Sequence, residues 1–246
     1  MLSRSALLSN SYAHPPERRS TRWIIRATLL ALAPFLQSVE GEERLRRQRG
    51  PFVVALNHSQ RTEAFLVPAL LAWLRGGRLI RFLADWNYML LPPVHALYRS
   101  ARVIPVISKP ASPRFLTGFR DLLTSPPTGF ECARKCLGRG QPVGLFVEGT
   151  TNRDPTRLLR GRRGAARLSL EADVPVLPIG IRFPEHSDPG RKIADHEALS
   201  LHVGHPLTPP TSDDLPRWHA AIMRAVASCS DTAWEGAEAR PPTVPA

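Results

Sequence analysis

The stretch PFVVALNHSQRTEAF (residues 51–65) joins a continuous apolar run to a polar turn. An apolar run of this length is typical of a strand that is buried on both faces. The turn after it contains His58 and, five positions later, the carboxylate of Glu63. In α/β folds, the end of a strand is where functional side chains are presented, so this stretch predicts both a fold class and a candidate site.

Similar apolar runs recur along the chain and predict further strands. They are RLIRFLA (78–84), RVIPVI (102–107), PVGLFV (142–147), VPVLPIGI (174–181) and LSLHVG (199–204). Between and after them, helical patterns are expected at 62–75, 112–123, 129–138, 161–172 and 213–229. Strands that alternate with helices favour an α/β domain, a layered mixed sheet with flanking helices.

The length of 246 residues and the apolar fraction of 43% suit one principal domain. We expect residues 50–230 to form it. Residues 1–20 are expected to be disordered, and the Pro- and Ala-rich residues 231–246 to form a flexible tail. Residues 21–49 are expected to form a helical, amphipathic region before the domain.

The apolar run from Trp23 to Leu36 is too short to cross a membrane. It contains 14 residues and is interrupted by Arg26 and Pro34, whereas a spanning helix needs about 20 apolar residues. Trp23, Phe35 and the flanking arginines suit an interfacial helix on acidic lipid. The alternative interpretation is a helix that packs against the domain.

The chain is strongly basic. It carries 33 Lys and Arg against 21 Asp and Glu, a net charge of +12, which favours anionic partners such as nucleic acid, acidic lipid or phosphorylated substrates. Arginine bias from a GC-rich genome is an alternative source of this charge. Aromatic residues make up only 7% and are not interleaved with the arginines, so no nucleic-acid partner is expected. No G-x-S-x-G, Walker A or H-E-x-x-H motif occurs, and no metal site is predicted.

The spacing of His58 and Glu63 gives a weak signal by itself, but their position gives it chemical meaning. A carboxylate that holds one imidazole nitrogen leaves the other free to act as a general base. A second polar stretch, FVEGTTNRD (146–154), also follows a strand, and Gly149 permits a tight turn there. Glu148 and Thr150 are then expected at the same end of the sheet as His58. The alternative is an ordinary turn with solvated polar residues.

Four blocks in one order resemble the glycerolipid acyltransferase family: NHSQRTE (57–63), RVIPV (102–106), FVEGTT (146–151) and VPVLPIGI (174–181). The resemblance covers roughly residues 50–210. It implies that His58, oriented by Glu63, deprotonates a lyso-lipid hydroxyl, which attacks the thioester of acyl-CoA or of an acyl carrier protein. It also implies that no cofactor is needed and that the protein works peripherally at a membrane surface with acidic lipids, on the cytoplasmic face.

The resemblance also implies roles for residues of the third and fourth blocks. Glu148, Gly149 and Thr150 are expected to bind the acceptor, and the strand with Val176 and Pro178 is expected to lie at the acyl site. In the first block the family usually has aspartate where this chain has Glu63, which is one methylene longer.

Two arginines of the family pattern are missing from their usual places. Ser108 stands where the second block has arginine, with Lys109 next to it, and Thr151 replaces the arginine of the third block, with Arg153 two places later. Arginine suits phosphate because its planar fork binds two oxygens. Either Lys109 and Arg153 bind the phosphate of a 1-acylglycerol-3-phosphate acceptor, or the acceptor is a different lyso-lipid, such as a lysophospholipid or lyso-ornithine lipid. A basic binding protein without catalysis is the remaining alternative.

Overall fold

The computed structural model describes residues 19–90, 92–107, 118, 128–186 and 188–236. Its strands are β1 (Leu36–Glu40), β2 (Val53–Leu56), β3 (Arg81–Asp85), β4 (Ile104–Val106), β5 (Val143–Phe146), β6 (Val176–Arg182) and β7 (Leu199–Val203). Its α-helices are α2 (Arg19–Leu32), α3 (Glu42–Arg47), α4 (Glu63–Leu74), α5 (Pro92–Ala101), α7 (Gly129–Gly138), α8 (Gly164–Ala172) and α9 (Leu215–Ser230). Two 3-10 helices, η1 (Ala33–Phe35) and η2 (Trp86–Leu90), complete the described elements.

Within the described residues, the strands form one seven-stranded sheet in the order β1-β7-β6-β2-β5-β3-β4. Neighbouring strands are parallel except β6 and β7, which pair antiparallel. The predicted mixed sheet with flanking helices is therefore confirmed. Because β2, β5 and β6 are parallel, their carboxyl ends meet at one edge of the sheet, and the polar turn after β2 begins at this edge.

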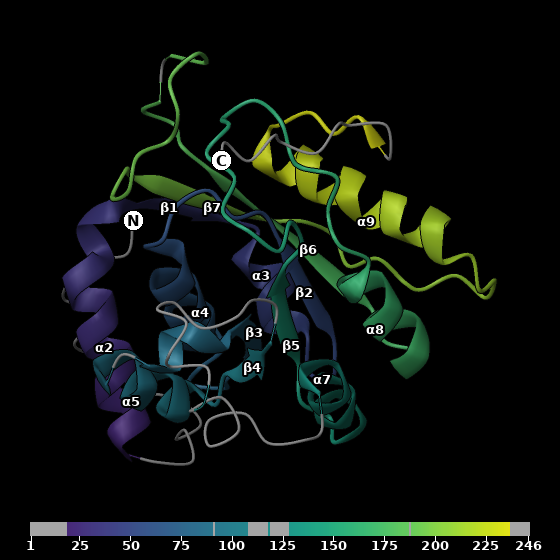
Figure 1. Cartoon of the computed structure of the whole chain (residues 1–246), viewed down its shortest axis with the longest axis horizontal. Helices are drawn as coiled ribbons and strands as arrows, with labels where there is room; N and C mark the ends of the chain where they lie inside the picture. The colour runs from purple at the N-terminus through teal and green to yellow at the C-terminus, as the bar shows by residue number, and fades with distance from the viewer. Residues whose placement is uncertain (1–18, 91, 108–117, 119–127, 187, 237–246) are drawn as a thin grey trace.

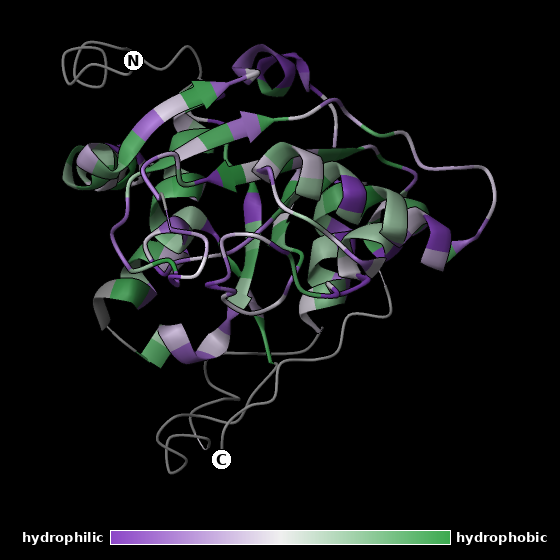
Figure 2. Ribbon diagram, turned by 90° about the horizontal axis from the view of Figure 1, so that it is seen from above, coloured by the Kyte–Doolittle hydropathy of each residue, from purple (hydrophilic) through white to green (hydrophobic). Residues whose placement is uncertain are grey.

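Helices cover both faces of the sheet (Figure 1). Side chains of successive strand residues point to opposite faces, so β2 contributes to two cores. Val54 and Leu56 pack in a cluster with residues of α2 and α4. Val53 and Ala55 pack in a second cluster with residues of α7, α8 and α9. All four residues of β2 have no exposed surface, which explains why its sequence is apolar throughout, and the central strands are largely hydrophobic in Figure 2.

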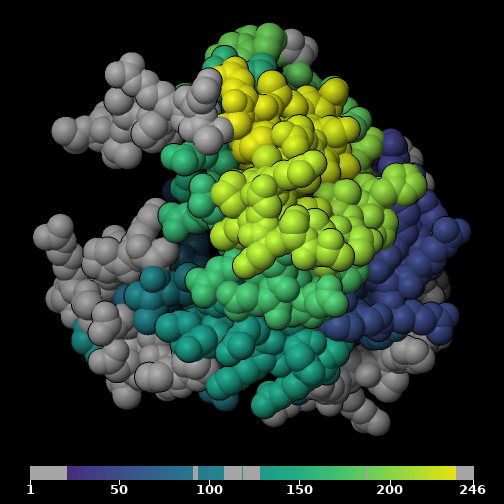
Figure 3. Space-filling model, turned by 90° about the vertical axis from the view of Figure 1, so that its right-hand side faces the viewer, coloured from purple at the N-terminus to yellow at the C-terminus, as the bar shows by residue number. Residues whose placement is uncertain are grey.

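Helix α9 lies close against β6 and covers much of one face beside α8 (Figure 3). A Cβ added at Gly180 in β6 would collide with the backbone of Cys229 in α9. Only a residue without a side chain permits this approach, so Gly180 sets the distance between the sheet and its closing helix.

The predicted strands and most predicted helices agree with the structure to within a few residues. The sequence prediction missed α5, which begins with two prolines, and the predicted helix at 112–123 falls outside the described residues. The expectation of a wholly helical region at 21–49 was wrong at 36–40, because β1 pairs with β7 there. A short edge strand of half-buried residues gives little periodic signal.

Helix α2 has an inner and an outer face. Ile25 and Leu29 are buried against the domain, as the alternative interpretation of this region predicted, whereas the Trp23 side chain is 69% exposed. No helix in the described part of the chain combines the length and apolar character needed to cross a membrane.

Candidate active site

His58 and Glu63 form a pair at the carboxyl edge of the sheet. The Nδ1 atom of His58 lies 2.9 Å from Oε2 of Glu63. The histidine is in the turn after β2, and Glu63 is the first residue of α4, so the turn 57–62 folds the two side chains together. The predicted pair therefore exists, and the extra methylene of glutamate relative to aspartate does not prevent it.

The carboxylate of Glu63 is enclosed and held by hydrogen-bond donors. Its side chain has no exposed surface. Besides His58, it accepts the backbone N–H of Ser59 at 2.8 Å and that of Gln60 at 3.1 Å. Burial raises the pKa of Glu63, while the hydrogen bonds from His58 and these two N–H groups oppose the rise. An ionised carboxylate can only accept hydrogen bonds, so with Glu63 in that state the proton of the pair is on Nδ1 of His58, and a neutral imidazole then has its lone pair on Nε2.

One face of the His58 imidazole ring packs against the side chain of Phe146. Its centroid lies 4.3 Å from that of Phe146, at the end of β5, and Phe146 in turn lies 6.0 Å from Phe82 of β3. The His58 side chain is 15% exposed. No hydrogen-bond partner for Nε2 occurs among the described residues. The ring is thus fixed on one edge by Glu63 and on one face by Phe146.

The residue before the histidine braces the strand end. Asn57 donates from Nδ2 to the carbonyl of Ile181 at 3.0 Å and accepts the N–H of Ile181 on Oδ1 at 2.7 Å. This reciprocal pair joins the end of β2 to the end of β6. The sequence predicts no role for Asn57, because its partner Ile181 lies 124 residues away along the chain.

Glu148 lies behind His58, inside the protein. One carboxylate oxygen accepts the backbone N–H of His58 at 3.1 Å, and the other accepts Nδ2 of Asn152 and the N–H of Leu159, both at 2.8 Å. The residue is only 4% exposed, and burial raises its carboxyl pKa to about 7 against the effect of these donors. The sequence predicts Glu148 among the acceptor-binding residues, but both its oxygens are occupied by the protein. Its geometry is that of a residue that positions the His58 backbone.

The turn after Glu148 is open to solvent. Gly149 has a φ of 68°, a conformation that favours glycine. Thr150 is exposed and Thr151 is half-buried, and their hydroxyls have no hydrogen-bond partner among the described residues. This turn therefore adjoins the His58 turn, where the N–H of Asn152 donates to the carbonyl of His58 at 2.7 Å, and it presents two hydroxyl groups without a partner in the described ranges.

Arg153 is held by an acidic partner. It donates to Oδ2 of Asp195 at 2.8 Å and to the carbonyl of Ile193 at 2.7 Å. Asp195 also accepts the N–H of Arg61, in the turn that carries His58. In this arrangement Arg153 braces the site instead of presenting a free guanidinium to an acceptor. Lys109, the other predicted phosphate contact, lies outside the described residues.

The segment between β6 and β7 packs on the His58 turn at further points. The carbonyl of Glu197 accepts Nε2-bound hydrogen from the Gln60 side chain at 2.8 Å, and His196 lies 3.2 Å from the hydroxyl of Thr62. The sequence did not predict this support. Its only local signal was the polar run ADHE (194–197), which resembles any exposed loop.

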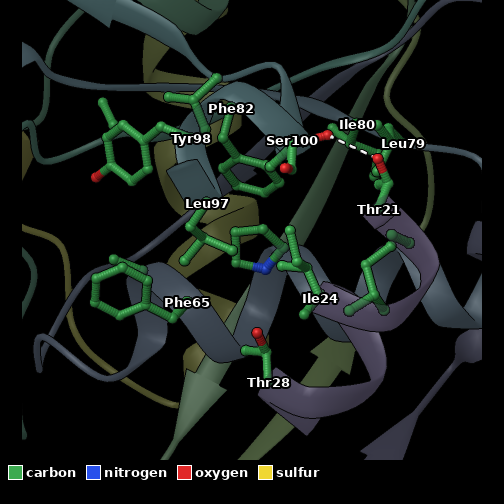
Figure 4. A pocket seen from close by; sticks show the side chains of 18 of the residues that line it. Thr21, Ile24, Thr28, Phe65, Leu79, Ile80, Phe82, Leu97, Tyr98 and Ser100 are labelled. Atoms are coloured by element: carbon green, nitrogen blue, oxygen red, sulfur yellow. Dashed lines mark hydrogen bonds between the residues drawn. The ribbon is translucent and has the colours of Figure 1, made fainter. Parts of the chain in front are cut away.

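Val176 and Pro178, on the predicted acyl-site strand, lie on the opposite face of the sheet from an apolar cavity among the described residues. Val176 has no exposed surface and packs with residues of α8 and α9, and Pro178, two residues on, projects to the same face. The cavity lies on the other face of the sheet, among α2, α4, β3 and α5 (Figure 4). Its lining includes Ile24, Phe65, Phe82, Leu97, Tyr98 and Phe146. Sequence alone could not assign these strand residues to a face, because β6 is apolar on both sides.

A family model described as Acyltransferase matches residues 37–182, more than half of the chain and all four sequence blocks. The chain belongs to the acyltransferase family. The family resemblance drawn from the four blocks is thereby confirmed.

A solved structure shares the fold of this acyltransferase. It is the crystal structure of PlsC, the 1-acyl-sn-glycerophosphate acyltransferase of Thermotoga maritima, with a TM-score of 0.57 and 19% sequence identity. The match covers 90% of this chain and 86% of that one. At this identity the likeness demonstrates a common fold. No curated protein sequence matches the chain significantly.

Proposed function

We propose that this acyltransferase moves a fatty acyl group from an acyl thioester to the hydroxyl of a lyso-glycerolipid such as 1-acylglycerol-3-phosphate. One observation carries the proposal: a histidine and a buried glutamate form a 2.9 Å pair at the edge of the sheet in a member of the acyltransferase family. The PlsC neighbour, named for its 1-acyl-sn-glycerophosphate substrate, supports the substrate class by analogy of fold.

In the proposed reaction His58 is the general base. Its Nδ1–H stays bonded to Glu63, and Nε2 takes the proton of the acceptor hydroxyl while that oxygen bonds to the thioester carbonyl carbon. The carbon–sulfur bond then breaks, and the thiolate of coenzyme A or of an acyl carrier protein receives the proton from His58. Glu63 stabilises the imidazolium between the two steps. This sequence of steps forms no acyl-enzyme and requires no metal or prosthetic group.

The apolar cavity is the proposed site for a fatty acyl chain. It is bounded by apolar side chains of α2, α4, β3 and α5, as alkyl chains require. Phe146 lines this cavity and also contacts the ring of His58. A chain held there would have its reactive end beside the base. In this proposal the acyl chain lies in the apolar cavity and not beside Val176 and Pro178, where the sequence resemblance placed it.

We further propose that the protein acts peripherally on the cytoplasmic face of a membrane. The large apolar side chains with the greatest exposure among the described residues are Trp23, Tyr88 and Ile107, at 69%, 42% and 53%. Trp23 projects from α2, a helix without acidic residues. The net charge of +12 would favour the acidic lipids of that leaflet. Nucleic acid has no part in this proposal.

The direct test is acyl transfer by the purified protein in detergent. Labelled acyl-CoA and acyl carrier protein would be offered against a panel of lyso-lipids. His58→Ala should abolish product formation, whereas the matched control His205→Ala, at an exposed histidine, should leave it unchanged. Absence of product with every donor and acceptor, from folded wild-type protein, would refute the proposed activity and leave lipid binding without catalysis as the explanation of the fold.

A further inference from the structure

The open turn after Glu148 lies beside Arg162, an arginine that belongs to none of the four sequence blocks. A Cβ added at Gly149 would collide with Nε and Cδ of Arg162, so the arginine side chain lies directly against this glycine. Its backbone is fixed at the same strand end, since the N–H of Arg162 donates to the carbonyl of Val147 at 2.7 Å. Arg162 is therefore anchored at the rim of the candidate site, although it lies eleven positions after Thr151 in the chain.

The positive charge of Arg162 is available to a ligand. The residue is exposed, and no ion pair or side-chain hydrogen bond joins it to any described residue. The hydroxyls of Thr150 and Thr151 on the same turn also have no partner within the described ranges. Arg153 differs, because its guanidinium is engaged by Asp195 and Ile193. The rim thus offers one guanidinium and two hydroxyls to an oxygen-rich anion.

The position of this group of donors relates it to the base. Gly149 follows Glu148, whose carboxylate accepts the N–H of His58. A glycerol phosphate carries its hydroxyls and its phosphate on one short carbon frame. An anion held at the Gly149 turn is therefore next to the backbone of His58, to which Glu148 and Asn152 of the same turn are hydrogen-bonded. A guanidinium binds phosphate through two parallel, charge-assisted hydrogen bonds.

The neighbouring arginine does not share this position. Arg163 is also exposed and has no ion pair among the described residues. Its charge, with that of Arg160, lowers the pKa of His219 on α9, which burial already lowers. Arg163 therefore lies toward α9 and provides a control of equal charge that is also exposed.

We propose that Arg162, with the hydroxyls of Thr150 and Thr151, binds the phosphate monoester of the acceptor. Arg162 thereby takes the role of the arginine that the family has at the position of Thr151. The inference rests on the proposed function and narrows it: the acceptor is a lyso-lipid with a terminal phosphate. It differs from both explanations drawn from the sequence, since it requires neither Lys109 nor Arg153, and it does not require a phosphate-free acceptor.

The test compares two acceptors with the same acyl chain, lysophosphatidic acid and monoacylglycerol, with acyl-CoA as donor. Arg162→Ala should lower kcat/KM for lysophosphatidic acid by about 10- to 100-fold, mainly through KM, and leave monoacylglycerol transfer unchanged. Arg162→Lys should recover part of the loss, because it restores charge without the fork. Arg163→Ala should match the wild type. Circular dichroism would show that each variant folds.

Several results would overturn the inference. An equal loss on both acceptors, with a raised KM for acyl-CoA, would assign Arg162 to the donor. A loss in Lys109→Ala with none in Arg162→Ala would assign the phosphate to Lys109. If the wild type preferred monoacylglycerol to lysophosphatidic acid, the acceptor would not need a phosphate, and the proposal would be wrong. Failure of the wild type to transfer acyl groups to any lyso-lipid would instead refute the proposed function, so the two failures are distinguishable.

Discussion

Replacement of Glu63 by glutamine tests the proposed base most directly, because it removes one charge and preserves the shape of the side chain. The carboxylate accepts three hydrogen bonds, from His58, Ser59 and Gln60. In glutamine, one oxygen still accepts, but the amide group must face a donor. The variant therefore loses the anion that stabilises protonated His58 and leaves a buried donor unpaired.

The size of the effect follows from these two losses. Removing the carboxylate that orients a catalytic histidine lowers kcat by about 10²- to 10⁴-fold, which corresponds to ~3–5 kcal/mol of barrier. An unsatisfied buried donor costs about 1–3 kcal/mol of folding stability. For a chain of this length such a loss lowers Tm by roughly 2–12 °C. Both changes are expected together in Glu63→Gln.

The assay is acyl transfer to lysophosphatidic acid, with thermal unfolding measured on the same preparations. Glu63→Asp keeps the charge and should lose less than about tenfold in kcat, since it changes only the reach of the side chain. Glu171→Gln, at an exposed carboxylate, is the matched control and should behave as the wild type. If Glu63→Gln keeps kcat within about threefold of wild type while His58→Ala is inactive, the carboxylate does not assist the base and the reasoning is refuted.

Three further predictions concern stability and membrane contact. Gly180→Ala should lower the free energy of unfolding by about 3 kcal/mol through its collision with Cys229, while Gly138→Ala, where a Cβ meets no atom within 4 Å, should change it by less than about 1 kcal/mol; similar Tm values for the two would contradict the packing argument. The pKa of Glu148 rises on folding to about 7, so the stability that this group contributes is present at low pH and is lost as pH rises through about 7. Denaturant unfolding should therefore show Glu148→Gln gaining stability relative to wild type between about pH 5 and pH 8, and a constant difference would count against the raised pKa. Trp23→Ser should weaken binding to acidic vesicles by about tenfold with an unchanged Tm, because this exposed ring contributes little to the fold; unaltered vesicle binding would argue against membrane contact through α2.

The sequence by itself predicted the architecture and the pair of His58 and Glu63 at the carboxyl edge of the sheet. Strands such as β2 are buried on both faces and therefore read as continuous apolar runs. His58 and Glu63 are linked by a short turn between a strand and a helix, so local chain geometry already brings them close. Four blocks in order were enough to indicate the family. These features depend on neighbours in the chain, which sequence patterns report well.

Only the tertiary structure decided what depends on distant segments. The sequence cannot show that Glu148 supports the His58 backbone from within, that Arg153 is held by Asp195, or that Val176 faces away from the apolar cavity. It also gives no reason to connect Arg162 with Gly149, because only the folded turn places one side chain on the other. Each of these contacts joins residues whose separation along the chain carries no periodic signal. The face of a strand and the partner of a charged group are fixed by packing, and packing exists only once the sheet and its helices have come together.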